Sequence, residues 1–422
     1  MELKRVVVTG LGAITPLGND VATSWQAAKE GKSGAGPITH FDASKFRTQF
    51  ACEVKDFNPA DHFDRRKERQ LDLYAQYALV AARQAIADSG IDQEGAADKN
   101  RVGVIIAAGI GGLHTFEEEA GNYAVTGAEK GPKYNPFFIP KMIADISSGH
   151  VSMEYGFHGP NFGVVSACAS SNNALIEAFN LIRLGMADAM VTGGAEAAIF
   201  PAGVGGFNAM HALSTRNDDP QGASRPFSKS RDGFVMGEGS VVLILEELEH
   251  AKARGAKIYA EFAGGGMSAD AHHLTATHPE GLGAELAMNN ALKDAGMKPE
   301  DIDYINVHGT STPVGDISEV KAIVKVFGDH VHKLNISSTK SMTGHLLGAT
   351  GAMEAMLCVK AIEDSIVPPT INHQEGDEDE EIDYTINFTF NRAQERPIRA
   401  ALSNSFGFGG HNATVILKKY EG

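Results

Sequence analysis

Cysteine and tryptophan are scarce in this 422-residue chain, which has three cysteines and one tryptophan. The cysteines (Cys52, Cys168 and Cys358) are odd in number, and no two of them have Cys-x-x-Cys spacing. Such a set argues against a disulfide framework and a zinc knuckle, and it favours a reducing compartment, namely the cytoplasm. Aromatic residues make up 7% of the chain, whereas glycine contributes 47 residues, so close backbone packing is expected.

Long apolar runs, a basic surplus and cofactor motifs are also missing. No apolar run reaches about 18 residues, so no membrane span is expected, and the N-terminal run is too short for a signal peptide. The net charge of −16 argues against nucleic acid as the main partner. Residues 9–13 lack the third glycine of a dinucleotide fingerprint, and His272, His273 and His278 form only a weak zinc pattern. We therefore expect no structural metal and no bound cofactor.

Apolar strand-like runs alternate with helical segments along the chain, which predicts an α/β fold with covered sheets. Residues 5–12 and 101–112 indicate buried strands that close in glycine turns, and residues 64–89 indicate a helix. After residue 255 a similar succession restarts, with elements expected at residues 257–263, 284–295, 303–308, 335–338 and 346–362 and a glycine turn at 264–266. The sequence thus predicts two similar halves, residues 1–255 and 256–422. The acidic run 375–383 is expected to be a solvated loop.

Cys168 lies where an apolar segment passes into an apolar helix. It stands between two alanines, and Leu175, Phe179 and Ile182 recur after it at helical spacing. A helix N-terminus offers unpaired N–H groups and a positive dipole end, which favour thiolate over thiol and make a cysteine nucleophilic. A small buried hydrophobe is the alternative, and the local pattern alone does not decide between the two.

Two histidines stand in segments that are dense in hydroxyl groups and small residues. His308 ends a predicted strand and begins His-Gly-Thr-Ser-Thr-Pro, and His345 ends the motif Lys-Ser-Met-Thr-Gly-His that starts at Lys340. A third segment, Asn-Ser-Phe-Gly-Phe-Gly-Gly, spans residues 404–410. The doubled pattern places Cys168 and His345 at matching helix starts. A helix-start cysteine with two such histidines predicts a nucleophile with supporting bases.

These three motifs and Val-Ser-Ala-Cys-Ala-Ser at residues 165–170 resemble, in this order, the motifs of elongating β-ketoacyl-acyl-carrier-protein synthases of the thiolase-like superfamily. The resemblance covers essentially the whole chain. It implies a layered α-β-α-β-α fold, a homodimer and no required cofactor. It also implies a decarboxylative Claisen condensation, in which an acyl chain passes from carrier protein to Cys168 and malonyl-carrier protein loses CO2 and attacks the thioester. The 3-oxoacyl product stays on the phosphopantetheine arm of acyl carrier protein.

The resemblance implies a role for each matching residue. Cys168 is the nucleophile, His308 and His345 stabilise the developing enolate as uncharged rings, and backbone N–H groups of Cys168 and Phe408 form the oxyanion hole. Phe408 also acts as a gate. The remaining assignments are Lys340, Glu354 and Asp316 as supporting residues; Phe406, Gly407 and Gly409 as neighbours of the gate; Ile110, Thr310, Thr312 and His273 as substrate contacts; and Asn306, Glu354, Ser403 and Asn404 around a monovalent cation that some relatives hold.

Carrier docking needs a local basic patch, because this chain and acyl carrier protein are both acidic. The expected patch consists of Arg65, Arg66, Lys67, Arg69, Lys130 and Lys133. Two matching positions differ from many relatives: His411 replaces a threonine, and His211 replaces an arginine that contacts the carrier. Ile110 is typical of type II enzymes, whereas type I enzymes have glycine there.

Other functions fit parts of the same pattern. A type I elongating synthase and the condensing subunit of a type II polyketide system share the cysteine and both histidines. A non-catalytic chain-length factor has the same fold but lacks the cysteine, which argues against it here. A papain-like hydrolase matches the spacing between Cys168 and His308, but its Cys-Gly-Ser-Cys-Trp signature is absent. Chain-length preference and the physiological carrier cannot be read from the sequence.

Overall fold

The computed structural model of the protein describes residues 3–422. Its main sheet has ten strands in the order β10-β9-β13-β14-β8-β1-β7-β6-β4-β5. The strands are β1 (Val6–Ile14), β4 (Val102–Ala107), β5 (Asn161–Phe162), β6 (Ala189–Glu196), β7 (Gly239–Glu247), β8 (Ala260–Ala269), β9 (Tyr304–Asn306), β10 (Asn335–Ser337), β13 (Ala400–Gly407) and β14 (His411–Lys418).

The sheet consists of two five-stranded halves with the same internal order. In the N-terminal half β5, β4 and β6 run parallel, and β7 and β1 follow antiparallel. In the C-terminal half β10, β9 and β13 run parallel, and β14 and β8 follow antiparallel. The halves join where Val6–Val8 of β1 pairs with residues 260–262 of β8. The predicted duplication is therefore present in the strand topology.

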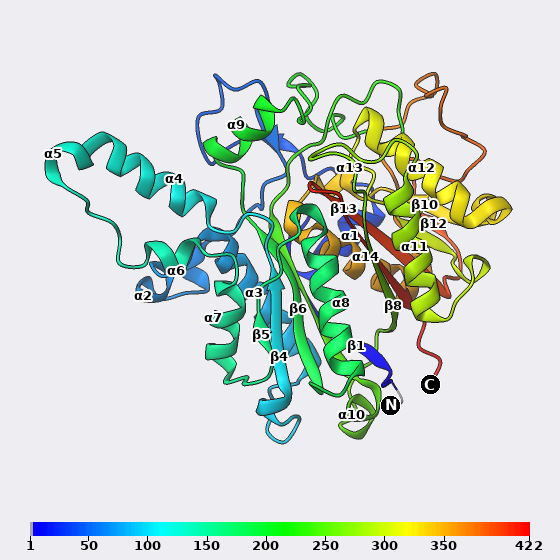
Figure 1. The fold of residues 1–422 in the computed structure, drawn as a ribbon, viewed down its shortest axis with the longest axis horizontal. Helices are drawn as coiled ribbons and strands as arrows, with labels where there is room; N and C mark the ends of the chain where they lie inside the picture. The colour runs from blue at the N-terminus through cyan, green and yellow to red at the C-terminus, as the bar shows by residue number, and fades with distance from the viewer. Residues whose placement is uncertain (1–2) are drawn as a thin grey trace.

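Helices cover both faces of each half-sheet (Figure 1). On one outer face lie α3 (Leu73–Ser89) and α7 (Ile146–Tyr155), and on the other lie α11 (Leu282–Ala295) and α12 (Pro313–Phe327). Between the half-sheets, α8 (Ser170–Arg183) packs against α14 (Thr350–Asp364). Three apolar clusters fill the interior, one in the central layer and one in each of the two outer layers. This confirms the predicted α-β-α-β-α arrangement.

The predicted glycine turns after the first strand of each half are wrong. β1 continues through Gly12 to Ile14, and β8 continues through Gly266 to Ala269. A Cβ on Gly12 would lie 2.0 Å from the carbonyl oxygen of Ala81 in α3, and one on Gly266 would lie 2.1 Å from that of Ala287 in α11. The glycines thus let a helix backbone lie directly against each strand.

Several other predicted boundaries also differ. The helix expected at residues 64–89 divides into α2 (Arg65–Glu68) and α3, whose N-cap Asp72 accepts a hydrogen bond from the N–H of Tyr74. The helix expected from residue 346 begins at Thr350, after a 3-10 turn at residues 347–349. The acidic run is not wholly solvated, because Asp379 pairs with Arg231 at 2.8 Å.

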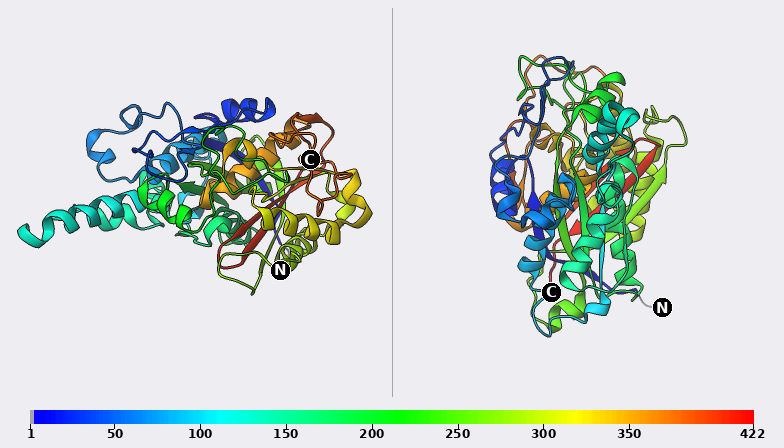
Figure 2. Two further views of the ribbon diagram at one scale, coloured as in Figure 1. Left: turned by 90° about the horizontal axis from the view of Figure 1, so that it is seen from above. Right: turned by 90° about the vertical axis from the view of Figure 1, so that its left-hand side faces the viewer.

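An arm extends from the body of the protein in Figure 1 and in the left-hand view of Figure 2. It consists of α4 (Leu113–Asn122), a π-helical turn (Tyr123–Gly127) and α5 (Ala128–Lys130), and the chain returns through α6 (Phe138–Met142). Several of its large apolar side chains are exposed, namely Phe116, Tyr123, Val125, Tyr134, Phe137 and Ile139. The remaining α-helices within residues 3–422 are α1 (Val21–Lys29), α9 (Pro201–Ala209), α10 (Leu248–Ala253) and α13 (Lys340–Thr343). Two short strand pairs lie outside the main sheet, namely β2–β3 (Gly36–Pro37 and Phe50–Ala51) and β11–β12 (Ile366–Val367 and Gln394–Glu395). The other helical segments are 3-10 helices of three to six residues.

Candidate active site

Cys168 lies in a tight turn just before α8. The preceding residue, Ala167, has a φ of +51°, a left-handed conformation that costs free energy for any residue but glycine. The Ser170 hydroxyl accepts a hydrogen bond from the N–H of Ser166 at 2.9 Å and donates one to the carbonyl of Ala167 at 2.6 Å. Gly407 packs against this turn, because a Cβ there would lie 3.0 Å from the Cys168 nitrogen. The turn is thus held from two sides.

The Cys168 side chain lines a cavity of about 430 Å³ that His308 and His345 also line. These three residues come from the start of α8, the end of β9 and the turn before α14. The structure therefore brings together the three side chains that the sequence singles out. The walls also include Phe406, Gly407, Phe408, Thr310, Thr312, Phe234, Phe207 and Leu347.

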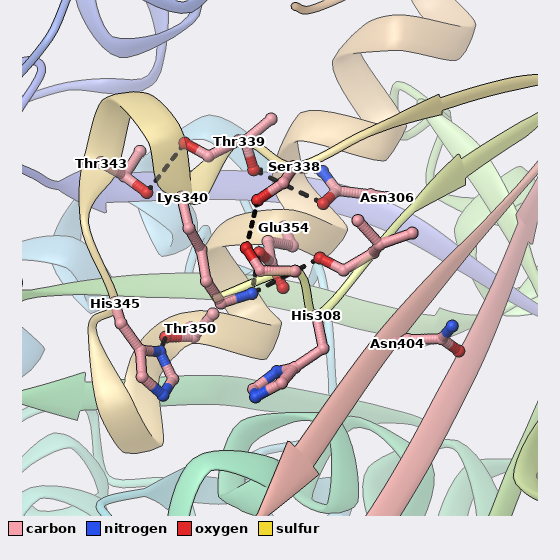
Figure 3. A network of polar contacts seen from close by, with 12 residues as sticks. Asn306, His308, Ser338, Thr339, Lys340, Thr343, His345, Thr350, Glu354 and Asn404 are labelled. Carbon is pink, nitrogen blue, oxygen red and sulfur yellow. Dashed lines mark hydrogen bonds and ion pairs between the residues drawn. The ribbon is translucent and has the colours of Figure 1, made fainter. Parts of the chain in front are cut away.

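The two imidazole rings stand at right angles, with centroids 5.3 Å apart and an interplanar angle of 88°. Figure 3 shows them side by side, with the Lys340 ammonium group next to both. The Thr350 hydroxyl lies 3.0 Å from Nδ1 of His345, so Nε2 of that ring is left for a substrate. Burial, together with the charge of Lys340, holds the pKa of His308 and of His345 well below the usual value. Both effects favour the neutral form of the two rings at physiological pH.

Lys340 and Glu354 form a buried ion pair, with Nζ 2.5 Å from Oε1 and both side chains 1% exposed. Burial raises the pKa of Glu354 to about 8, although the charge of Lys340 opposes that rise. The pair lies behind the two histidines and does not line the cavity. Its position is that of a supporting group.

Burial opposes the thiolate form that the helix N-terminus was expected to favour at Cys168. It raises the pKa of the thiol to about 12, and the charge of Glu196 adds to this rise, whereas the charge of Lys340 and the backbone N–H groups of Phe408 and Cys168 partly offset it. These contributions favour the thiol in the free protein.

Phe408 sits on a loop of unusual backbone conformation. Gly409 has a φ of +91°, and its N–H donates to the carbonyl of Leu274 at 2.7 Å. The backbone N–H groups of Phe408 and Cys168 both lower the pKa of the Cys168 thiol, which indicates that both lie near the sulfur. Thr310 and Thr312 line the opposite wall, and their hydroxyls lie 3.1 Å apart.

Asp316 supports this wall from behind. Its Oδ1 accepts from the N–H of Ser311 at 3.1 Å and its Oδ2 from that of Phe227 at 2.9 Å. Because Ser311 has a φ of +66°, the buried carboxyl group fixes a strained turn between the two threonines. Asp316 therefore shapes the loop and does not face the cavity.

Two predicted substrate contacts lie outside this cavity. Ile110 is 39% exposed on the loop after β4, and His273 is exposed on the loop after β8, where its Nδ1 accepts from the N–H groups of Thr275 and Ala276. Neither side chain lines the cavity. His211 does line it, and its Nδ1 lies 2.5 Å from Nη1 of Arg47.

The predicted docking residues fall into two groups. Arg65, Arg66 and Arg69 are exposed in and after α2, whereas Lys67 is half-buried, with Nζ 3.1 Å from Nδ1 of His150. Arg65 and Arg69 line a surface hollow of about 450 Å³ together with Lys141. The second group is exposed on the arm and consists of Lys130 and Lys133.

Three residues near the cavity were not predicted from the sequence to have a role in the site. Thr350 orients His345, Glu319 accepts from the N–H groups of His308 and Gly309 at 2.9 and 2.8 Å, and Glu196 accepts from four backbone N–H groups. Thr350 follows His345 by five residues, so its place near that motif was a signal in the sequence. No signal in the sequence indicates either glutamate, because the partners of both are backbone N–H groups that only the folded structure brings near. Burial raises the pKa of each glutamate to about 7.

The residues expected around a monovalent cation fit such an ion in part. Oε2 of Glu354 and Oγ of Ser403 are buried without a hydrogen-bond partner among residues 3–422, and oxygen is the ligand that hard cations prefer. The side-chain oxygen of Asn404, however, accepts from Thr414 at 2.7 Å, and that of Asn306 contacts Thr339. No group of three or more His, Cys, Asp or Glu side chains suited to a metal occurs in that part of the chain.

Comparison with known proteins identifies two matching family models and several relatives that align over nearly the whole chain. The model of the N-terminal domain of beta-ketoacyl synthases matches residues 3–251, and that of their C-terminal domain matches residues 259–374. The chain is 51% identical over 419 residues to a Coxiella burnetii protein named 3-oxoacyl-[acyl-carrier-protein] synthase 2, with 99% of each covered. A Staphylococcus aureus protein of the same name is 50% identical over 420 residues, also with 99% of each covered.

A solved structure extends the comparison to the fold. It is described as a type II PKS acyl-carrier protein in complex with its ketosynthase bound to the hexaketide. The matched chain has a TM-score of 0.89 and 35% identity, and the match covers 99% of this chain and 100% of that one.

Proposed function

The chain belongs to the β-ketoacyl synthase family, and from this premise we propose how its residues carry out the reaction of a 3-oxoacyl-[acyl-carrier-protein] synthase of type 2. The protein is an acyltransferase that forms a carbon–carbon bond in fatty acid elongation, and it requires no cofactor. Its substrates are an acyl chain and a malonyl group, each a thioester on acyl carrier protein. The products are CO2 and a 3-oxoacyl chain that is two carbons longer.

In the first half-reaction, Sγ of Cys168 attacks the acyl carbonyl carbon and the carrier thiol leaves. One proton is conserved, because the cysteine thiol gives one up and the departing carrier sulfur takes one up. The N–H groups of Cys168 and Phe408 stabilise the negative charge on the carbonyl oxygen. Both N–H groups lower the pKa of the Cys168 thiol, so they act close to the reacting sulfur, which supports this assignment. Because Cys168 rests as a thiol, its proton leaves during the attack and not before it.

In the second half-reaction, the malonyl carbon–carbon bond breaks, CO2 departs and the electron pair forms an enolate on the thioester. Ring N–H groups of His308 and His345 donate to the enolate oxygen. The Thr350 hydroxyl lies 3.0 Å from Nδ1 of His345, and with this hydroxyl as the donor the ring proton is on Nε2. The enolate carbon then attacks the Cys168 thioester, and the cysteine sulfur leaves. It takes up one proton from water, so this half-reaction consumes one proton. Neutral rings suit this step, because a cationic ring would stabilise the malonyl carboxylate and oppose the loss of CO2.

The shared cavity of Cys168, His308 and His345 is the observation that carries the proposal. Its test is the Cys168→Ala variant, assayed for each half-reaction separately. Acyl transfer from carrier protein, followed by intact mass, should be lost, whereas release of CO2 from malonyl-carrier protein should continue. The His308→Ala variant should show the reverse pattern. Formation of 3-oxoacyl product by the Cys168→Ala protein would rule out this nucleophile.

Acyl carrier protein is the partner, and we propose that it docks on α2 and the adjoining arm. The exposed guanidinium groups of Arg65, Arg66 and Arg69 support this, because they form a local basic surface on a chain of net charge −16. Such a surface can attract an acidic carrier despite the overall charge. Lys67 belongs to this surface only in part, because its ammonium group contacts His150.

We also propose that two copies of the chain form a homodimer. The edge strand β5 leaves one side of the sheet open, and Phe162 and Val165 beside it are 40% and 62% exposed. The exposed apolar side chains of the arm supply further surface of the kind that partners bury. A cytoplasmic location is part of the same proposal, and the three free buried cysteines support it.

A condensing subunit of a polyketide system is the second candidate, because the polyketide ketosynthase above shares the fold at 35% identity. Identity near 50% to fatty acid synthases favours the first candidate. Octanoyl- to palmitoleoyl-carrier substrates distinguish the two. An elongating synthase extends them by one malonyl unit, whereas a polyketide enzyme leaves them unextended or adds several units without reduction.

A further inference from the structure

Glu196 ends β6 and is wholly buried, yet no step of the reaction above uses it. Its Oε2 accepts from the N–H of Gly109 at 2.8 Å and from that of Gly348 at 3.0 Å. Its Oε1 accepts from the N–H groups of Ile110 at 3.1 Å and Gly111 at 3.2 Å. One carboxylate thus satisfies four backbone donors. Since Gly348 lies in the C-terminal half and the others in the N-terminal half, it also joins the two halves.

The groups that Glu196 holds lie against the turn of the nucleophile. Gly348 follows Leu347, which has a φ of +49° and lines the cavity in the same apolar cluster as Cys168. On the other side, a Cβ on Gly109 would lie only 3.3 Å from the carbonyl oxygen of Ala167. Both strained turns, at residues 167 and 347, therefore border the loop that the carboxylate fixes.

We propose that Glu196 is a positioning residue for acyl transfer, because its carboxylate holds Leu347 and the loop 109–111 against the turn that carries Cys168. The inference rests on the proposed function and assigns this carboxylate to one of its two half-reactions. An isosteric glutamine has one acceptor oxygen instead of two. One of the two N–H pairs then faces an amide N–H₂, and either Gly348 or the loop after β4 loses its anchor.

The histidines have backbone anchors that do not involve Glu196. The backbone N–H of His345 donates to the carbonyl of Val235 at 2.7 Å, and the carbonyl of His345 accepts from Gly237 at 2.8 Å. His308 is anchored by Glu319. Loss of the Glu196 carboxylate should therefore disturb acyl transfer more than decarboxylation, a split that general destabilisation does not produce.

The test compares Glu196→Gln with Glu53→Gln at pH 8, where the carboxyl group of Glu196 is ionised. Glu53 is a matched control, because it is buried and accepts from the N–H groups of Thr39 and His40 at 2.9 and 3.2 Å but does not line the cavity. Acylation of Cys168 by acyl-carrier protein should slow about 10- to 100-fold in Glu196→Gln, with KM for the carrier unchanged. Malonyl decarboxylation should stay within about threefold, and Glu53→Gln should behave as wild type in both assays.

Each result decides the inference. An equal fall in both half-reactions, or no fall in acylation, overturns it. If Glu196→Gln does not fold, Leu347→Ala removes the side chain that the carboxylate positions, and it must show the same split for the inference to stand. Wild-type protein that forms no 3-oxoacyl product would instead refute the proposed function, so the two failures are distinguishable.

Discussion

Replacement of Lys340 by methionine tests how the active site controls the charge of its histidines. The substitution keeps an unbranched side chain but removes the ammonium group that lies 2.5 Å from Oε1 of Glu354. Breaking one partner of a buried ion pair costs about 3–5 kcal/mol, because the other charge remains without compensation. The charge of Lys340 opposes the rise that burial causes in the pKa of Glu354, so its loss raises that pKa further and the carboxyl group takes up a proton in the variant. We therefore expect the free energy of unfolding to fall by about 3 kcal/mol, at the lower end of this range.

The same change should alter the pH dependence of decarboxylation. The charge of Lys340 helps to lower the pKa of His308 and of His345, so its removal raises both pKa values toward the ordinary value near 6.5. In the wild type both rings stay neutral down to acid pH, so protonation of the histidines should not reduce the rate of malonyl decarboxylation between about pH 5.5 and 8. In the variant, protonation of the rings at the acid end should reduce the rate there.

Urea unfolding and CO2 release from malonyl-carrier protein measure the two effects. Lys252→Met is the matched control, because Lys252 is 46% exposed and pairs with Glu249 at 3.1 Å on the surface. Exposed pairs of this kind contribute about 0–1 kcal/mol. The reasoning fails if Lys340→Met loses no more stability than Lys252→Met, or if its decarboxylation profile keeps the shape of the wild-type profile.

Two further predictions follow from the site and the docking surface. Thr350→Val should reduce malonyl decarboxylation about tenfold and spare acylation of Cys168, because Nδ1 of His345 loses its hydrogen-bond partner. Thr350→Ser keeps the hydroxyl group and should retain the rate. Equal decarboxylation rates in the valine and serine variants would contradict this prediction. Charge reversal at Arg65, Arg66 and Lys67 should raise KM for carrier-linked substrates, most at low salt, and leave small thioesters unaffected. Equal loss of activity with small thioesters would disprove the docking surface.

The sequence by itself determined the doubled succession of elements and the motifs of the active site. Apolar periodicity at Leu175, Phe179 and Ile182 marked the central helix, and all three side chains are buried. The hydroxyl-rich segments marked His308 and His345 because such polar residues are unlikely core fillers at strand ends and turns. Local patterns suffice for these features, since each depends on neighbours a few residues away along the chain.

Tertiary structure alone decided the features that depend on distant partners. The glycines of β1 and β8 predict turns, but both strands continue through Gly12 and Gly266, where the glycines allow a helix to pack directly against the strand. Burial of Cys168 opposes the thiolate form that its helix start favours, and the depth of this burial is not visible in the sequence. Glu196 gave no signal, since the four N–H groups that it binds come from two loops more than 80 residues away on either side. Long-range burial and backbone contacts are properties of the folded chain, and only the fold can assign them.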